Sequence, residues 1–130
     1  MTAESRFGLD RIGQIAVNVK DLDRATAFYR DVLGMRPLFQ VPKMAFFECG
    51  GIRLMLSLPE KPEFDHPGSI LYYKVDDIKA AHAALRGRGA PFEGEPHVVA
   101  QLPAHDLWMA FCRDSEGNLL ALMSEVRRAA

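Results

Sequence analysis

The sequence predicts an α+β fold in which one β-α-β-β-β unit occurs twice within a single domain, over residues 9–58 and 69–126 of the chain 1–130. The main observation is an internal repeat. The segment 14–22 returns 56 positions later as 70–78, and each copy has the pattern of a strand, an Asp and the start of a helix. Two copies of so short a unit must pack together, because neither copy can bury its apolar face alone.

The strands after each helix are repeated as well. The segment 44–56 resembles 109–122, in which the turn is slightly longer. Aligning the glycines of these two turns pairs Met55 with Ala121. A slip of one residue would turn these side chains to the other face of the sheet, so the register is a prediction for the structure to test.

The first unit begins with alternating apolar and polar side chains over 11–19, the pattern of a strand with one buried face. A helix follows, because Asp21 is a good N-cap, apolar side chains then recur at helical spacing, and Gly34 is a typical stop. Turn residues separate the rest into three strands, which we expect to pair as an antiparallel meander. These strands cover 37–41, 44–49 and 52–58.

The joining segment 59–68 is rich in proline and charge, and it is too short to link separate domains. The second unit then repeats the order, with a strand over 69–75 and a helix that is capped by Asp77 and closed by glycines. Its three remaining strands are predicted near 98–102, 107–113 and 119–125.

Length, charge and cysteine content limit the classes of function that the protein can have. A chain of 130 residues can bury a core without disulfides, and Cys49 and Cys112 are best interpreted as small apolar residues in a reducing cytosol. With 16 basic and 17 acidic residues, the chain has no charge excess for binding nucleic acid or an anionic membrane. It has neither an apolar stretch of about 18 residues nor a signal peptide, so we expect a cytoplasmic protein.

Two motifs accompany the duplicated unit. They are Phe-Tyr-Arg-Asp-Val-Leu-Gly-Met over 28–35 and Phe-Cys-Arg-Asp-Ser-Glu-Gly-Asn over 111–118. With these motifs the chain resembles the vicinal oxygen chelate superfamily, which holds glyoxalase I, extradiol dioxygenases, fosfomycin-modifying enzymes and bleomycin-resistance proteins. The resemblance covers about 9–126. It implies two modules whose curled mixed sheets enclose a cavity.

The resemblance also implies four strand positions for the ligands of a divalent ion, which chelates adjacent oxygens of the substrate. Glyoxalase I carries a His or Gln, a Glu, a His and a Glu there. In this chain the positions fall on Gln14, Met55, Ile70 and Ala121. Three of these side chains offer no suitable donor, and one neutral amide cannot hold an ion against water. We therefore predict neither a metal ion nor another cofactor.

Without a metal, the space between the sheets is predicted to be a largely apolar pocket with a few polar groups, as small-molecule sites usually are. The expected partner is an apolar or aromatic small molecule, and the competing interpretation is that the same side chains fill a core. The predicted ligand-binding residues are Gln14, Asn18, Met55, Ser57, Tyr72, Trp108 and Ala121. We also expect a homodimer, because relatives commonly cover such faces with a second subunit. The modules can pair within one chain or across that dimer.

The histidines supply the alternative function, a glyoxalase-like lyase or isomerase that uses histidine acid/base chemistry or an atypical divalent metal site. His105, His97 and Glu95 are the candidate catalytic residues, because the segment 93–108 would border the mouth of the cavity. Neighbours in a strand point to opposite faces, so Asp106 is poorly placed to orient His105. Hydrogen bonding to a ligand and a purely structural role stay open for these residues.

Overall fold

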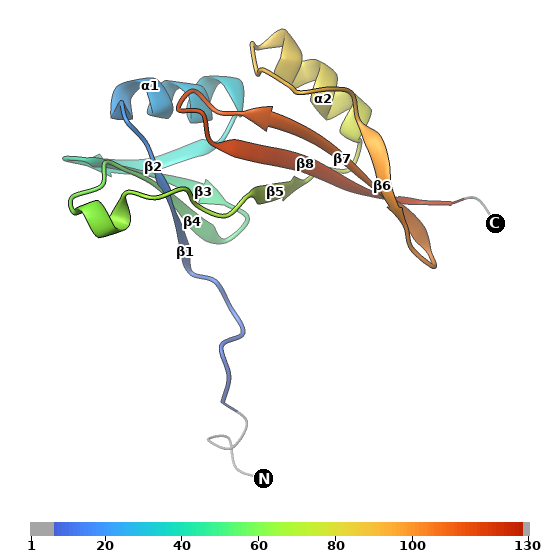
Figure 1. Ribbon diagram of the computed structural model, residues 1–130, viewed down its shortest axis with the longest axis horizontal. Helices are drawn as coiled ribbons and strands as arrows, with labels where there is room; N and C mark the ends of the chain where they lie inside the picture. Colours follow the sequence, from blue (N-terminus) through green and yellow to red (C-terminus); the bar gives the residue numbers. More distant parts are fainter. Residues whose placement is uncertain (1–6, 129–130) are drawn as a thin grey trace.

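The computed structural model describes residues 7–128 and confirms the duplicated β-α-β-β-β fold (Figure 1). The elements of the first module are β1 (Gln14–Asn18), α1 (Leu22–Ala27) with its π-helical continuation η2 (Phe28–Val32), β2 (Arg36–Val41), β3 (Met44–Cys49) and β4 (Ile52–Ser57). The joining segment contains one short helical turn, η3 (Pro62–Phe64). The elements of the second module are β5 (Leu71–Lys74), α2 (Ile78–Gly87), β6 (His97–Gln101), β7 (His105–Arg113) and β8 (Leu119–Arg127).

Each module forms its own four-stranded mixed sheet, in the orders β1-β4-β3-β2 and β5-β8-β7-β6. In both sheets the first strand pairs in parallel with the last, and the other neighbours are antiparallel. The predicted meanders are therefore confirmed. Strand β1 begins later than predicted, because its only partner in the sheet, β4, starts at Ile52.

Helix caps and strand register follow the repeat. Both predicted Asp caps accept a hydrogen bond from the backbone N–H three residues later, at 3.0 and 3.1 Å. Met55 pairs with Ala16 in the first sheet. Ala121 pairs with Tyr72 in the second. These two partners are themselves repeat equivalents, so Met55 and Ala121 occupy matching positions, as the turn glycines predict.

Each helix covers one face of its own sheet, and the core of the module lies between them (Figure 1). In the first module Tyr29, Phe47 and Leu56 are almost completely buried, and Ile15 and Val17 of β1 pack against them. The core of the second module forms in the same way beneath α2. Within residues 7–128, neither α1 nor α2 covers the opposite face of either sheet, which leaves it available for a ligand or a second subunit.

The turn between β7 and β8 binds the second module to the first, and we name this contact the intermodule clasp. Tyr29 donates a hydrogen bond of 2.7 Å to the buried carboxylate of Asp114. Glu116 accepts a 2.7 Å hydrogen bond from Arg24, and it also accepts from two backbone N–H groups at the start of α1. The hydrogen bond from Arg24 is the main reason why the pKa of the Glu116 carboxyl is only about 2. The two backbone donors lower this pKa further.

Both thiols are free. Cys112 has no exposed surface, and Cys49 is half-buried. Burial raises the pKa of each thiol above its ordinary value, so both are protonated at neutral pH. Within residues 7–128, no helix is long and apolar enough to cross a membrane.

Candidate ligand-binding site

The sheet faces that carry no helix are named the open faces. Strand alternation assigns their residues, because Ile15 and Val17 of β1 and Leu122 of β8 pack into the helix-covered cores. The first open face carries Gln14, Ala16, Asn18, Phe46, Arg53, Met55 and Ser57. The second carries Tyr72, Lys74, His105, Met109, Phe111, Ala121, Met123 and Glu125. Every predicted ligand-binding residue except Trp108 therefore lies on an open face.

Ala121 lies between two aromatic side chains on the second open face. It pairs with Tyr72 of β5 on one side and with Phe111 of β7 on the other. The two rings meet edge to face with their centroids 6.1 Å apart, and Ala121 has no exposed surface. Ala121 is therefore covered by its neighbours in this structure, and its contact with a ligand stays a prediction. Tyr72, which is 44% exposed, is the side chain that a ligand would meet.

Aromatic rings also lie on the first module. Phe46 stacks on Phe39 of β2 with centroids 4.5 Å apart, and the guanidinium of Arg53 lies 5.4 Å from the centre of the Phe46 ring. Oε1 of Gln14 accepts a 2.9 Å hydrogen bond from Arg53, while Nε2 of Gln14 lies 3.7 Å from the sulfur of Met55. Gln14 and Met55 are therefore neighbours, and the Gln14 amide already has partners within the protein.

Asn18 attaches the joining segment to β1. Its amide nitrogen donates to the backbone oxygens of Phe64 and His66, so its donor is used within the chain. This gives Asn18 a structural role, and its contact with a ligand stays a prediction. Ser57 makes only a long contact of 3.4 Å to the oxygen of Leu58, so its hydroxyl keeps most of its hydrogen-bonding capacity.

The four strand positions do not form a donor set for a divalent ion. Gln14 and Met55 lie together on the first open face, Ile70 precedes β5, and Ala121 is buried beside aromatic rings. Among the residues that the structure describes, no group of three or more His, Cys, Asp and Glu side chains is arranged to hold a metal. An amide and a thioether do not match the carboxylate and imidazole ligands that hard and borderline ions require.

A charged cluster on the second open face brings His105, Glu125 and Lys74 together. Nε2 of His105 lies 3.1 Å from one carboxylate oxygen of Glu125, off the line of a hydrogen bond. The other oxygen accepts a 2.7 Å hydrogen bond from Lys74, which lowers the pKa of the Glu125 carboxyl. The carboxylate beside His105 is therefore Glu125, which sequence reasoning missed because the two residues lie on different strands.

The other predicted catalytic residues lie elsewhere. Glu95 is 3.6 Å from the buried ring of His82 and 3.5 Å from Arg86. His97 is exposed on the edge strand β6, where its Nδ1 lies 3.0 Å from the backbone oxygen of Glu95. The structure therefore does not assemble His105, His97 and Glu95 into one catalytic group.

Trp108 lies on the helix-covered face of the second sheet. It packs against the core cluster that contains Ile78 and Leu122, and Nζ of Lys79 lies 5.1 Å from the centre of its ring. Strand β7 presents Met109 to the open face instead. Trp108 and Tyr72 therefore lie on opposite faces of the second sheet, because alternation divides a strand into two sets of side chains without indicating which set a helix will cover. The binding of a ligand by Trp108 stays a prediction.

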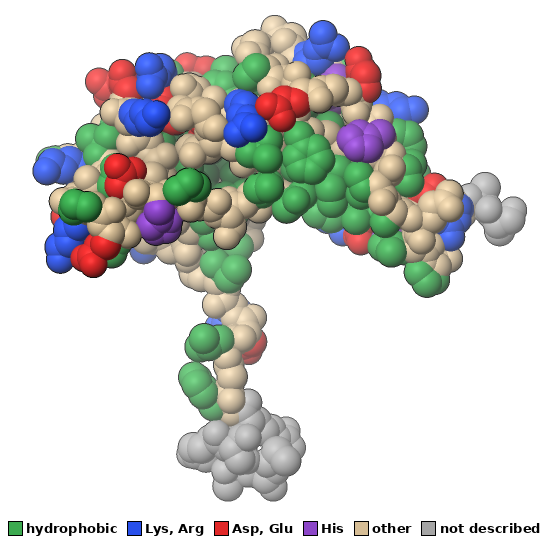
Figure 2. All heavy atoms as spheres, viewed as in Figure 1, with side chains coloured by type: hydrophobic (Ala, Val, Ile, Leu, Met, Phe, Trp, Pro, Cys, Tyr) green, Lys and Arg blue, Asp and Glu red, His purple; other side chains and the backbone are tan. Residues whose placement is uncertain are grey.

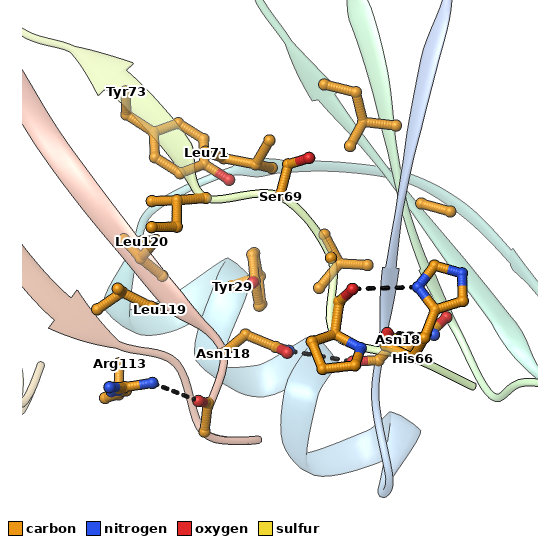
Figure 3. A pocket seen from close by; sticks show the side chains of 17 residues that line it. Asn18, Tyr29, His66, Ser69, Leu71, Tyr73, Arg113, Asn118, Leu119 and Leu120 are labelled. Atoms are coloured by element: carbon orange, nitrogen blue, oxygen red, sulfur yellow. Dashed lines mark hydrogen bonds between the residues drawn. The ribbon is translucent and has the colours of Figure 1, made fainter. Parts of the chain in front are cut away.

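A cavity of about 420 Å³ lies between the modules (Figure 3). Strand β1 forms one wall, and the joining segment with His66 and Ser69 forms another. Asn18 and Ile70 reach this cavity, whereas the aromatic pair of the second open face does not line it. The hydroxyl of Tyr73, another lining residue, is buried without a hydrogen-bond partner in the described chain. The cavity thus has apolar walls and a few polar groups, and it shares Ala16 and Asn18 with the first open face.

A tandem pair of β-α-β-β-β modules, each with one open sheet face, defines the glyoxalase/bleomycin-resistance class of fold. The model of the Glyoxalase/Bleomycin resistance protein/Dioxygenase superfamily matches residues 11–122, and the chain belongs to this superfamily. The resemblance seen in the sequence is therefore confirmed.

Solved structures share the fold at low sequence identity. A lactoylglutathione lyase from Agrobacterium tumefaciens is 24% identical, with a TM-score of 0.69 over 89% of this chain and 94% of that one. A virulence protein from Salmonella typhimurium is 20% identical, with a TM-score of 0.75 over 92% and 100%. TioX from Micromonospora sp. ML1 is 19% identical, with a TM-score of 0.73 over 90% and 100%. These likenesses show the fold alone.

Proposed function

We propose that the protein is a homodimeric binding protein, which holds an apolar or aromatic small molecule against its open faces without a metal ion. The observation that carries this proposal is the aromatic pair of Tyr72 and Phe111 beside Ala121. In the glyoxalase I pattern that the sequence resembles, the position of Ala121 is a metal-binding Glu. Two aromatic rings there offer a planar apolar ligand stacking and edge contacts instead.

Exposed apolar side chains support a second subunit over the open faces. Figure 2 shows apolar side chains gathered over the second module. The segment 7–13 runs away from both sheets and is apolar in part (Figure 1). The exposed large apolar residues of the open faces, the edge strands and this segment are Phe7, Leu9, Ile12, Leu38, Phe39, Val41, Ile70, Tyr72, Val98 and Val99. A monomer rarely exposes so much apolar surface, and a twofold dimer would bury it.

We also propose that the ligand is a small molecule rather than a nucleic acid and that the protein acts in the cytoplasm. The nearly balanced charge, 16 basic against 17 acidic residues, favours a small molecule over a nucleic acid. The two free thiols suit the cytoplasm, where they stay reduced.

Titration with N-phenyl-1-naphthylamine, a neutral aromatic probe that fluoresces in apolar surroundings, tests the binding proposal. We expect saturable binding, and we expect Tyr72→Ala to weaken it about tenfold, equivalent to about 1.4 kcal/mol. Lys79→Ala is the matched control, because it alters the helix-covered face beside Trp108. Unchanged affinity in Tyr72→Ala would contradict the proposal. Stoichiometric zinc, nickel, iron or manganese in protein purified without chelator would contradict its metal-free part.

One observation favours a second candidate function, a glyoxalase-like lyase or isomerase. His105 and Glu125 place an imidazole and a carboxylate 3.1 Å apart on the second open face, and an imidazole can transfer protons near neutral pH. The hemithioacetal of methylglyoxal and glutathione is the substrate to test, because a structural neighbour is a lactoylglutathione lyase. Turnover that His105→Ala abolishes would establish this function. No turnover, with or without added zinc or nickel, would exclude it.

A further inference from the structure

The two modules contact each other in two places that the repeat makes equivalent. Side chains fill one of these contacts, and the other contains a cavity. In the intermodule clasp, Tyr29 of the first helical segment reaches Asp114 in the turn after β7. The helix repeat of 56 residues makes Leu85 the counterpart of Tyr29. The strand repeat of 65 residues makes Cys49 the counterpart of Asp114. The second contact therefore lacks both the phenol ring and the carboxylate that fill the first.

A cavity of about 330 Å³ lies at this second contact, between α2 and the first module. Leu85 and Cys49 both line it, which places it at the position equivalent to the clasp. The other walls are mainly apolar and include Leu33 from the end of η2 and Leu122 of β8. The volume falls within the range of about 300–1,000 Å³ that is typical of small-molecule sites.

Among the residues that the structure describes, Arg88 is the one charged residue that lines this cavity. Its side chain is anchored by a 3.2 Å hydrogen bond from Nη1 to the backbone oxygen of Val32. None of the ion pairs formed within residues 7–128 includes Arg88, so its charge is not neutralised by the protein. A guanidinium at an apolar cavity is suited to a carboxylate, which it can bind through two parallel hydrogen bonds.

We propose that this cavity is a second ligand site, which takes a small carboxylic acid with an apolar body. The apolar body lies against Leu33, Leu85 and Leu122, and the carboxylate pairs with Arg88. The site is on the helix-covered side of the second sheet, so it is separate from the open faces and does not depend on the function proposed for them. Tyr73 lines both this cavity and the intermodule cavity, so a bound acid lies at the junction of the two modules.

Cys49 is a natural reporter of occupancy. It lines the cavity, is half-buried and has a free thiol, whereas the other cysteine, Cys112, has no exposed surface. Burial raises the pKa of the Cys49 thiol, so its modification by 5,5′-dithiobis(2-nitrobenzoate) is slow at neutral pH and is best followed at about pH 8.5. An occupied cavity covers this thiol and slows the reaction further.

The experiment measures the rate of Cys49 modification with 4-phenylbutyrate and with its neutral analogue 4-phenyl-1-butanol. We expect saturating 4-phenylbutyrate to slow the reaction at least tenfold, and the alcohol at the same concentration to slow it less. Arg88→Gln keeps the apolar walls and removes the cation, so it should abolish the difference between acid and alcohol. Ala84→Trp fills the cavity from α2 and should abolish protection by both, relative to its own ligand-free rate. Ala83→Trp, on the same helix but outside this cavity, is the matched control.

Equal rates of Cys49 modification with and without 4-phenylbutyrate would overturn the proposal. Stronger protection by the acid than by the alcohol in Arg88→Gln would overturn it as well. Arg88 is exposed, so that variant carries the test even if Ala84→Trp fails to fold. Tyr72→Ala separates this site from the open faces, because it should weaken N-phenyl-1-naphthylamine binding and leave the protection of Cys49 intact. Each proposal can therefore fail without the other.

Discussion

Tyr72 and Phe111 meet edge to face beside Ala121, with their ring centroids 6.1 Å apart. They come from β5 and β7, the two strands that flank β8. Neighbouring strands are about 4.8 Å apart, so rings on either side of a central strand can meet across it only where the central side chain is small. The first module reverses the arrangement, with Ala16 on the edge strand and the longer Met55 in the centre. The two open faces therefore differ in shape although the repeat is clear in the sequence.

Replacing Ala121 by Glu tests whether the aromatic pair excludes a metal-binding carboxylate. Ala121→Glu should lower the free energy of unfolding by about 2–4 kcal/mol, because the new carboxylate is buried without a partner. Ala16→Glu is the control, since Ala16 is exposed on the other open face and should tolerate the change within about 0.5 kcal/mol. Urea denaturation measures both variants. Equal losses of unfolding free energy in the two variants would show that the aromatic pair does not exclude a carboxylate at Ala121.

Two tyrosine hydroxyls should have opposite effects on stability. Tyr29→Phe removes the donor of a 2.7 Å hydrogen bond to the buried carboxylate of Asp114, and it should cost about 1–3 kcal/mol. Tyr73→Phe removes a buried hydroxyl that has no partner, so stability should stay the same or rise. Thermal unfolding of both variants measures which substitution lowers the stability more. A greater loss in Tyr73→Phe would mean that its hydroxyl has a partner in solution.

The intermodule clasp should make stability depend on acid through Glu116. Its pKa of about 2 lies below the ordinary value of 4.5, so it adds stability above pH 4.5 that is lost as the pH falls toward 2. Glu116→Gln should therefore lower the free energy of unfolding by about 2 kcal/mol at neutral pH and flatten its decline in acid. Denaturant titrations across this pH range measure the effect. Glu60→Gln, an exposed change in the joining segment, should keep the wild-type acid slope, and Glu116→Gln should not.

Sedimentation at micromolar concentration should give a species of twice the 14.5 kDa chain mass. Phe39→Asp places a charge among the exposed apolar side chains of β2 and should shift this species toward the monomer. Ala83→Asp on the exposed side of α2 should leave the dimer unchanged. A wild-type protein that sediments at 14.5 kDa would rule out the homodimer.

The sequence by itself determined the modules, their order and their register. Asp21 and Asp77 cap helices where the repeat predicts them, and the turn glycines correctly pair Met55 with Ala121. These features are predictable because caps, turns and strand alternation depend on residues close in the chain. The absence of suitable donors at the four metal-ligand positions also follows from residue identity alone.

Only the tertiary structure decided which side chains meet. Trp108 proved to face α2, Asn18 proved to hold the joining segment, and Glu125 proved to be the carboxylate beside His105. Glu116 reaches α1 across more than 90 residues of chain. Such contacts depend on how completed helices and sheets pack against one another. Local propensity and alternation describe each element separately, so they cannot specify which face is covered or which distant residue becomes its neighbour.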